Sequence, residues 1–523
     1  MHGNDIIAGL QVKGITLIET VDCNPYELEI RVPRENFKAA CLFVHTYLRS
    51  PVMALFALDL RRDNGTFEIR CVFLAKEISR WCTVVVSVAG NNPAIDSIAK
   101  EIYSATLFER EMKEMFGILP QGDPDLRTLR LHEEVCPEGA FPLRKDFAGI
   151  AAQKVPVCGY HFNRVEGEGV FEVPVGPVHA GIIGPGHFRF SVAGEPIVNL
   201  ELRLGFTHRG IEKLFEGKSA QECLHLSECV AGDSVIAHGW AFCRAVETIQ
   251  GVQIGADAFR VRAICLELER IYNHLSGVSG IALDVGFSFC AQYAALLKER
   301  VLQVNKKLSG HRYLKGVLRI GGVQRDFDQV VLRCVMDEIS LIKEDLDKLQ
   351  TMLYGSVSFM DRIDETGVLR KKTAEDFGVI GLAGRASGVS LDLRRVFSDG
   401  YAAAGFRRVK YEKGDVLARV RMRIDEVYES MRLIEVFAKQ LAPFPQNKGS
   451  AVRKDYAIGA VEGWRGPTFY WVKLVDGTVD RCKIVDASFH NWQGLSVAVL
   501  GNIVPDFPVS NKSFDLSYAG NDL

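Results

Sequence analysis

Three stretches in the second half of the chain place apolar side chains at steps of three and four residues. The longest run from Leu332 to Leu353 and from Leu417 to Leu441, and a shorter one runs from Arg260 to His274. This spacing puts the apolar residues on one face of a helix. Such faces bury most readily against other helices of the same bundle. The second half of the chain is therefore expected to form a helical core.

The N-terminal part has a different pattern, in which short apolar runs of strand character are separated by turn residues. The dipeptide Asn64-Gly65 is typical of a hairpin turn, and helical spacing precedes and follows the runs. This pattern predicts a compact α+β domain. Its predicted strands are Met53 to Asp59, Phe67 to Phe73 and Thr83 to Val88, and its predicted helices are Asn36 to Arg49 and Pro93 to Phe116.

A segment punctuated by proline and glycine, from Gln121 to Pro156, has too few periodic apolar residues for an element of its own and is interpreted as the linker. Beyond it, period-two patches from Gly159 to Leu204 predict a small sheet, and Asp476-Gly477 predicts a hairpin near the C-terminus. The fold class is therefore expected to be α+β. We place an α+β domain at 1–150 and a mainly helical domain with small β sections at 151–523.

Composition narrows the class of partner. The 63 lysines and arginines and the 65 aspartates and glutamates leave a net charge of −2, so no overall field draws the chain to nucleic acid or to an anionic membrane. The most apolar long segment, Ser276 to Leu297, contains Asp284 and Gln292 and is not a clean membrane span. The N-terminus lacks the pattern of a secretory signal peptide. A role at a membrane would therefore require partner subunits.

The thirteen cysteines contain no C-x-x-C pair, the spacing that lets two thiolates reach one metal ion. Scattered cysteines with mostly apolar neighbours are typical of reduced thiols in a protein core. Six of the twelve histidines lie between His161 and His238, and no pair among them has the i, i+4 spacing of a helical metal site. Glu109, Glu111 and Glu114 are interpreted as charges on the surface of a helix.

Distinctive strings occur along almost the whole chain. In the N-terminal part they are Glu109 to Ile118, Gly122 to Arg127 and Phe141 to Phe147, and in the second part Val175 to His179, Thr207 to Lys213, Tyr272 to His274, Ala282 to Gly286, Leu318 to Val323, Asp399 to Gly400 and Asp486 to Trp492. The first group resembles the 30-kDa-type (C) subunit of respiratory complex I. The second resembles the 49-kDa-type (D) subunit and the large subunits of group 4 membrane-bound nickel–iron hydrogenases. A fusion of the two is similar to the large subunit of formate hydrogenlyase.

The resemblance implies partners and a location. The partners would be a small iron–sulfur subunit of the complex I 20-kDa type, a ferredoxin-like subunit, and antiporter-like and other subunits of an ion-pumping membrane arm. The chain would lie peripherally on the cytoplasmic side of the cell membrane. It would exchange electrons through the iron–sulfur cluster of its partner, as part of an oxidoreductase.

A hydrogenase of this family holds nickel with four thiolates in two C-x-x-C pairs. Aligned on the string that contains His238, the first pair falls at Ala231 and Ser234, and the second pair falls at Ser517 and Gly520. None of the four is a cysteine, and nickel in such centres needs soft thiolate ligands. The resemblance therefore implies that this chain binds no nickel–iron centre and no other cofactor of its own.

The quinone pocket of the complex I relatives pairs a histidine with an aspartate and adds a tyrosine as a second donor. His179 and Asp284 match the first two positions, and Gly232 stands at the tyrosine position. A carboxylate beside an imidazole fixes its tautomer and raises its pKa, which suits proton transfer near neutral pH. The resemblance therefore assigns His179 and Asp284 as a catalytic pair, with His208 continuing a polar chain.

Three further residues are assigned to the region near the partner's cluster. Arg209 matches the family position beside the cluster, where a positive charge favours the reduced state, and Glu212 and His238 are placed in the same region. The alternative is that these groups only join buried surfaces through hydrogen bonds.

Three functions stay open at this point. The first is a large subunit of an energy-converting complex that has lost the nickel–iron centre. The second is an enzyme that uses His179 and Asp284 to reduce a quinone or another small carrier. The third is a non-catalytic scaffold that transmits redox changes to the membrane arm. A true hydrogenase is the least favoured.

Overall fold

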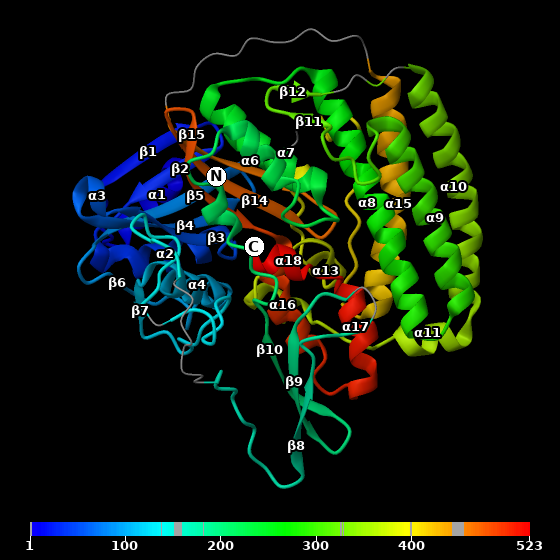
Figure 1. The fold of residues 1–523 in the computed structure, drawn as a ribbon, viewed down its shortest axis with the longest axis horizontal. Coiled ribbons are helices and arrows are strands. Elements are labelled where there is room, and N and C mark those ends of the chain that lie inside the picture. The colour runs from blue at the N-terminus through cyan, green and yellow to red at the C-terminus, as the bar shows by residue number, and fades with distance from the viewer. Residues whose placement is uncertain are drawn as a thin grey trace.

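A computed structural model describes residues 3–137, 139–150, 159–180, 183–324, 327, 329–397, 400–441 and 454–523. An N-terminal sheet domain stands on one side of the molecule and a bundle of long helices on the other, with a second sheet between them (Figure 1). A three-stranded sheet projects from the body below. The predicted α+β class is therefore confirmed.

The N-terminal domain is built on a five-stranded sheet with the strand order β1-β2-β5-β4-β3. The pairs β3–β4 and β4–β5 are antiparallel, and β2 runs parallel to β5. The three predicted strands and the first predicted helix are confirmed. The elements are α1 (Gly3–Val12), β1 (Glu19–Asn24), β2 (Glu27–Arg31), a 3₁₀ turn (Arg34–Asn36), α2 (Phe37–Leu48), β3 (Ala54–Leu60), α3 (Arg61–Asn64), β4 (Thr66–Ala75) and β5 (Arg80–Ala89).

The predicted helix from Pro93 to Phe116 is wrong in its first half. Strand β6 (Ala94–Asp96) pairs with β7 (Leu119–Gln121), a 3₁₀ turn covers Tyr103–Ala105, and only α4 (Thr106–Phe116) is helical. The carboxylate of Glu109 accepts hydrogen bonds from Ser97 Oγ at 2.6 Å and from the backbone N–H of Ile98 at 2.8 Å. These contacts hold the segment before α4 in an extended path, which local spacing does not encode.

The interpretation of the three glutamates of α4 as surface charges is also wrong, because all three make interior contacts. Glu109 and Glu111 are buried, and burial raises the pKa of Glu109 to about 8. Glu111 lies 2.6 Å from Lys483 Nζ and pairs with Arg130. Glu114 accepts three backbone N–H groups of the loop at 129–131. The later part of the chain folds over this face of the helix, which is why the charges are internal.

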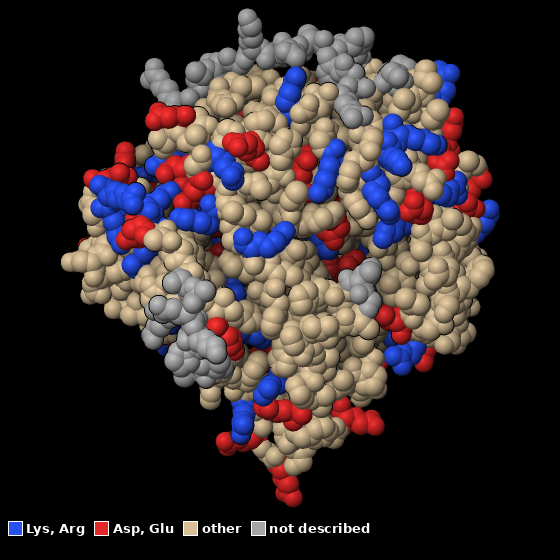
Figure 2. All heavy atoms as spheres, in the orientation of Figure 1, with Lys and Arg blue, Asp and Glu red and all other residues tan. Residues whose placement is uncertain are grey.

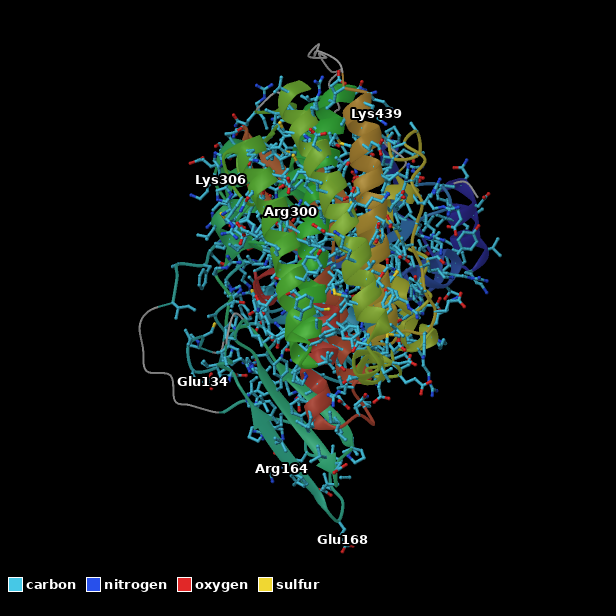
Figure 3. The ribbon with its side chains drawn as sticks, turned by 90° about the vertical axis from the view of Figure 1, so that its right-hand side faces the viewer. Glu134, Arg164, Glu168, Arg300, Lys306 and Lys439 are labelled. Atoms are coloured by element: carbon cyan, nitrogen blue, oxygen red, sulfur yellow. The ribbon has the colours of Figure 1, made fainter. Side chains whose placement is uncertain are left out.

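The second part contains the predicted bundle of long helices (Figures 1 and 3). The two predicted apolar stripes are buried in α10 and α15, and the third predicted helix extends further in both directions as α8. The helices of this part are α5 (Ile211–Phe215), α6 (Ala220–Ser227), α7 (Val235–Gln250), α8 (Ala256–Asp284), α9 (Ser288–Ser309), α10 (Gln329–Gly355), α11 (Val357–Ile363), α12 (Lys371–Asp376), α13 (Gly381–Ala386), α14 (Leu393–Val396) and α15 (Val416–Lys439).

Both predicted β sections are present. Strands β8, β9 and β10 form an antiparallel sheet, and β14 and β15 form the predicted hairpin around Asp476 and Gly477. Helices α16 to α18 return the C-terminus to the middle of the molecule (Figure 1). The bounds are β8 (Val170–Val175), β9 (His187–Ala193), β10 (Ile197–Arg203), β11 (Leu318–Arg319), β12 (Gly322–Val323), β13 (Tyr456–Glu462), β14 (Pro467–Val475), β15 (Thr478–Val485), α16 (Ala487–Ala498), a 3₁₀ turn (Val504–Asp506), α17 (Phe507–Phe514) and α18 (Tyr518–Asp522).

The two predicted domains share a hydrophobic core. Phe56 and Trp471 have ring centroids 5.2 Å apart, and Phe108 and Phe489 have centroids 4.9 Å apart. Buried residues of the N-terminal sheet and of α4 therefore pack directly on the sheet β13-β14-β15 and on α16. The boundary near residue 150 stays a prediction, because residues 151–158 lie outside the described residues, as does Asp399 of one family string.

The surface carries both signs of charge, with lysine, arginine and acidic side chains interspersed over the visible face (Figure 2). In the described part of the chain, no helix combines the length and apolar character that a membrane span needs.

Candidate functional site

A cavity of about 900 Å³ lies between α8, the segment before and within α18, and the loop that precedes α7. One wall is the C-terminal half of α8, where the small residues Ser276, Gly277, Ser279 and Gly280 leave space above the helix. The predicted positions Gly232, Asp284 and Ser517 all line this cavity, as do Ala180 and Thr207, the neighbours of His179 and His208. The structure thus brings two of the predicted quinone-site positions and one of the predicted metal-site positions to one cavity.

His179 and Asp284 do not form the predicted pair in this structure. His179 Nε2 lies 2.7 Å from the carbonyl oxygen of Gly186, and the His179 ring is 5.3 Å from that of Phe188. Asp284 is at the exposed C-terminal end of α8, where partial burial raises the pKa of its carboxyl and nearby Lys512 opposes that rise. Within the described residues the two side chains form no hydrogen bond with each other, although they belong to the same cavity region.

His208 and Arg209 hold the C-terminal helix in place. Nδ1 of His208 lies 2.8 Å from the carbonyl oxygen of Asp522, and the backbone N–H of Arg209 donates to the carbonyl of Leu523 at 2.7 Å. The guanidinium of Arg209 donates to the carbonyl of Val230 at 2.7 Å. Burial lowers the pKa of His208. These contacts position α18, and with it one end of the cavity.

Glu212 and His238 are deeply buried and join elements that are distant in sequence. Glu212 accepts from Arg481 at 2.8 Å and lies 3.2 Å from Lys483. Burial alone would raise its pKa, but these two cations lower it to about 2. His238 lies between Tyr470 Oη at 3.0 Å and Asp486 at 3.1 Å. In this chain both residues make interior contacts, and their proximity to a partner's cluster stays a prediction.

The four positions aligned with the nickel ligands do not fit a four-thiolate centre. Ala231 offers only a methyl group. The hydroxyl of Ser234 accepts from Trp464 Nε1 at 3.1 Å, and that of Ser517 caps α18 by accepting the N–H of Gly520 at 2.9 Å. A Cβ atom at Gly520 would lie 2.8 Å from Cγ of Asp486. In the described part of the chain, no group of three or more His, Cys, Asp and Glu side chains is arranged to hold a metal ion.

An ion pair between Asp233 and Arg465 stands beside these positions and was not predicted. Two hydrogen bonds of 2.8 and 2.6 Å join the guanidinium to the carboxylate, and the guanidinium stacks 3.9 Å from the ring of Trp464. Asp233 is partly exposed to the cavity, and Arg465 holds the pKa of its carboxyl below the usual range against the effect of burial. The residues are 232 positions apart, so no local pattern could reveal the pair. The only sequence signal was the place of Asp233 between Ala231 and Ser234.

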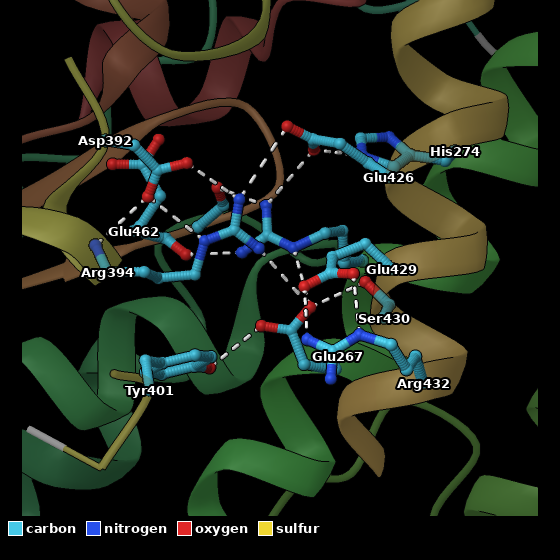
Figure 4. Close-up of polar contacts among 12 residues, drawn as sticks. Glu267, His274, Asp392, Arg394, Tyr401, Glu426, Glu429, Ser430, Arg432 and Glu462 are labelled. Carbon is cyan, nitrogen blue, oxygen red and sulfur yellow. Dashed lines mark hydrogen bonds and ion pairs between the residues drawn. The ribbon is translucent and has the colours of Figure 1, made fainter. Parts of the chain in front are cut away.

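A second unpredicted feature is a network of buried charges that joins α8, α13, α15 and β13 (Figure 4). Arg385 donates to Glu462 at 2.6 Å and to Glu426 at 2.7 Å, and His274 lies 2.9 Å from Glu426. Burial raises the pKa of Glu462 to about 7. A buried ion pair of this kind is stable only when each charged group has several charged or hydrogen-bonding partners. The network therefore fixes α8, α13, α15 and β13 relative to one another.

Comparison with known proteins identifies the two halves. Residues 30–153 match the family described as the respiratory-chain NADH dehydrogenase 30 Kd subunit. Residues 284–448 match the family described as the respiratory-chain NADH dehydrogenase 49 Kd subunit.

The relatives come from hydrogenase, complex I and sulfur-reducing complexes. Formate hydrogenlyase subunit 5 of Escherichia coli is 31% identical, over 90% of this chain and 84% of its own length. The fused C/D protein of the NADH-quinone oxidoreductase of Bacteroides thetaiotaomicron is 29% identical, over 72% of this chain and 74% of its own. A chain of the archaeal membrane-bound sulfane sulfur reductase, a respiratory membrane complex, superposes with a TM-score of 0.63 at 26% identity, over 68% of this chain and 99% of its own. The chain therefore belongs to the family of fused 30-kDa and 49-kDa complex I-type subunits that is related to the group 4 hydrogenases.

Proposed function

We propose that this chain is the large subunit of a membrane-associated, energy-converting oxidoreductase, that it carries no nickel–iron centre, and that it converts a small two-electron carrier in its cavity. The observation that supports the proposal is the cavity of about 900 Å³ beside the C-terminal half of α8. Among the described residues, its lining contains Gly232, Asp284 and Ser517 but no cysteine. A hollow with a few polar groups is the usual form of a small-molecule site.

The residue types at the four positions aligned with the nickel ligands support the absence of nickel. A methyl group and a glycine cannot coordinate a metal, and serine hydroxyls are poor ligands for a centre that needs thiolates. The hydroxyls of Ser234 and Ser517 are already engaged in hydrogen bonds. The Asp233–Arg465 pair stands beside these positions with charges that compensate each other.

The partners and the location follow from the relatives. Relatives of this chain are subunits of membrane-bound complexes. This chain would therefore receive or donate electrons through a small iron–sulfur subunit of the 20-kDa type, with a ferredoxin-like subunit further along the route. Antiporter-like and other membrane-arm subunits would hold it peripherally on the cytoplasmic side of the membrane. Arg209, which is exposed, would face the cluster-bearing partner.

The residues of the chain would supply protons and orientation. A carrier that accepts two electrons also takes up protons, and Asp284 and His179 are the titratable groups of the cavity region assigned to that task. The raised pKa of Asp284 favours its protonated form, which suits a donor. Because the two groups are apart in this structure, the carrier itself would lie between them.

A quinone is one candidate carrier, in line with the NADH-quinone oxidoreductase relatives. Sulfane sulfur is a second, favoured by the structural likeness to the sulfane sulfur reductase, which covers 99% of that chain. If neither carrier reacts, the chain would instead be a coupling subunit that catalyses no reaction of its own.

Metal analysis of the purified complex tests the first part of the proposal. We expect nickel well below one atom per complex, because no cysteine stands at the four positions. Iron and acid-labile sulfide from partner subunits serve as the internal control for intact complex. Stoichiometric nickel would overturn the proposal.

Turnover of the His179→Ala variant tests the second part. We expect a loss of carrier reduction of about 100-fold or more, typical of removing a general acid or base, while the complex still assembles. His225→Ala, which changes an exposed histidine on helix α6, is the matched control and should retain activity. Undiminished turnover in the His179 variant would remove the catalytic role and favour the coupling function.

A further inference from the structure

Three cations that have no carboxylate within hydrogen-bond distance among the described residues converge on one short stretch of α8. The stretch runs from Ser276 to Gly280 and lines the cavity. The cations come from three different helices: Lys298 from α9, Arg423 from α15 and Lys512 from α17. Their convergence is a property of the tertiary structure alone.

The contacts of each cation place it against a small residue of this stretch. Lys298 Nζ donates to Ser276 Oγ at 3.1 Å. A Cβ atom at Gly277 would lie only 2.4 Å from Arg423 Nε, and a Cβ atom at Gly280 would lie 3.4 Å from Cδ of Lys512. The two glycines therefore let these cations come close to the backbone of α8. At Gly277 the carboxylate of Asp515 approaches as well, with Oδ2 3.0 Å from the same Cβ position.

Arg423 is the most unusual of the three. Its side chain is fully buried, at 0% exposure, and its Nε and Nη2 atoms have no hydrogen-bond partner in the part of the chain that the structure describes. Its Nη1 donates to the carbonyl of Arg419 at 3.3 Å, and Asp515 stands 3.8 Å from Nη2. A buried charge with so little compensation is unfavourable, and it produces a fixed positive potential directly behind Gly277.

The acidic residues of the cavity do not neutralise the positive potential of these cations. Asp233 is engaged with Arg465, and Asp515 stands at a distance from Arg423 that is too long for a hydrogen bond. Asp284 stands near Lys512 without an ion pair. Among the described residues, neither Lys298 nor Lys512 forms an ion pair with a carboxylate. Lys298, Lys512 and Arg465 line the cavity together with Asp233, Asp284 and Asp515. Arg423, buried behind Gly277, adds a fourth cation, so the positive charges around the stretch exceed the negative ones by one.

We propose that the cavity binds its ligand as a small anion, held over Ser276 to Gly280 by the ammonium groups of Lys298 and Lys512 and by the field of the buried Arg423. A cavity with low-dielectric walls and one excess sign of charge concentrates ligands of the opposite sign. The inference rests on the proposed function, since it specifies the class of carrier that the same cavity takes. Anionic sulfur chains match this positive charge, whereas an uncharged quinone would gain no attraction from it.

Calorimetric titration of the purified complex tests the proposal with thiosulfate, a dianion with a sulfane sulfur, and with an uncharged short-chain benzoquinone. We expect saturable thiosulfate binding that weakens as salt rises. The double variant Lys298→Gln with Lys512→Gln should weaken it about tenfold or more and leave quinone binding within about twofold. Lys306→Gln, an exposed lysine on the same helix α9, is the matched control and should bind as the unmodified chain does.

The Arg423 variants separate charge from structure. Arg423→Lys keeps the cation and should retain thiosulfate binding, whereas Arg423→Gln should lose it. If Arg423→Gln fails to assemble, the lysine variants decide. Thiosulfate binding that is unchanged in the double variant overturns the inference, as does binding of the quinone alone, which would leave the proposed function standing. Binding of neither ligand would count against both.

Discussion

Single residues decide what the positions aligned with the nickel ligands can hold. Gly520 is the sharpest case, because the space that a side chain would need is filled by the carboxylate of Asp486, with its Cγ 2.8 Å from an added Cβ atom. That carboxylate also accepts from the backbone N–H of Ser488 at 2.7 Å and contacts His238, so it cannot move freely. The packing around Gly520 thus leaves no room for a metal-coordinating side chain at this position.

We expect Gly520→Ala to lower the free energy of unfolding by about 1–3 kcal/mol, the usual cost of overpacking a filled interior. Chemical denaturation of the purified chain measures the change. Gly355→Ala is the matched control, since none of the described residues lies within 4 Å of a Cβ atom there, and it should be close to neutral. A neutral Gly520→Ala variant would show that Asp486 yields to a side chain.

At the scale of elements, sequence periodicity predicted helices and strands better than it predicted their surroundings. The stripes of α10 and α15, the strands β3, β4 and β5 and the hairpin β14–β15 are confirmed because each depends on local spacing. The first half of the predicted helix before α4 is wrong, since Glu109 draws the backbone of Ser97 and Ile98 into a different path. The charge of Glu111 looked solvent-exposed because its partner Lys483 lies 372 residues away.

The contact between α4 and β15 offers a test at this scale. Lys483→Met should lower the free energy of unfolding by about 3–5 kcal/mol, because it leaves Glu111 and Glu212 buried with one cation fewer. The double variant Glu111→Gln with Lys483→Met should cost less than the sum of the two single changes. Strict additivity in that double-mutant cycle would contradict a direct α4–β15 pair.

The whole molecule behaves in this structure as one packed body made from two family modules. The cluster of buried side chains that contains Phe56, Phe108, Trp471 and Phe489 runs from the N-terminal sheet into the C-terminal sheet. A shared core couples the stability of its two sides. The fusion of the two modules in one chain is therefore matched by a continuous interior.

Calorimetry of the full chain should show a single unfolding transition, because neither module can lose its core without exposing that of the other. The ratio of the calorimetric to the van't Hoff enthalpy is the measure, and it should be close to one. Two resolved transitions would mean that the modules unfold independently. Phe108→Ala removes a large side chain from the shared core at α4. It should shift the whole unfolding transition and not only a part of it.

The sequence by itself determined most of the element pattern and the family strings, because both depend on local spacing and residue type. Only the tertiary structure decided that the charges of α4 are internal, that Asp233 pairs with Arg465, and that Lys298, Arg423 and Lys512 meet on α8. Pairings between distant residues depend on how helices and sheets pack, and packing responds to the shape of the whole interior. The character of the cavity, unlike the list of residues at its edge, is therefore a property of the folded chain.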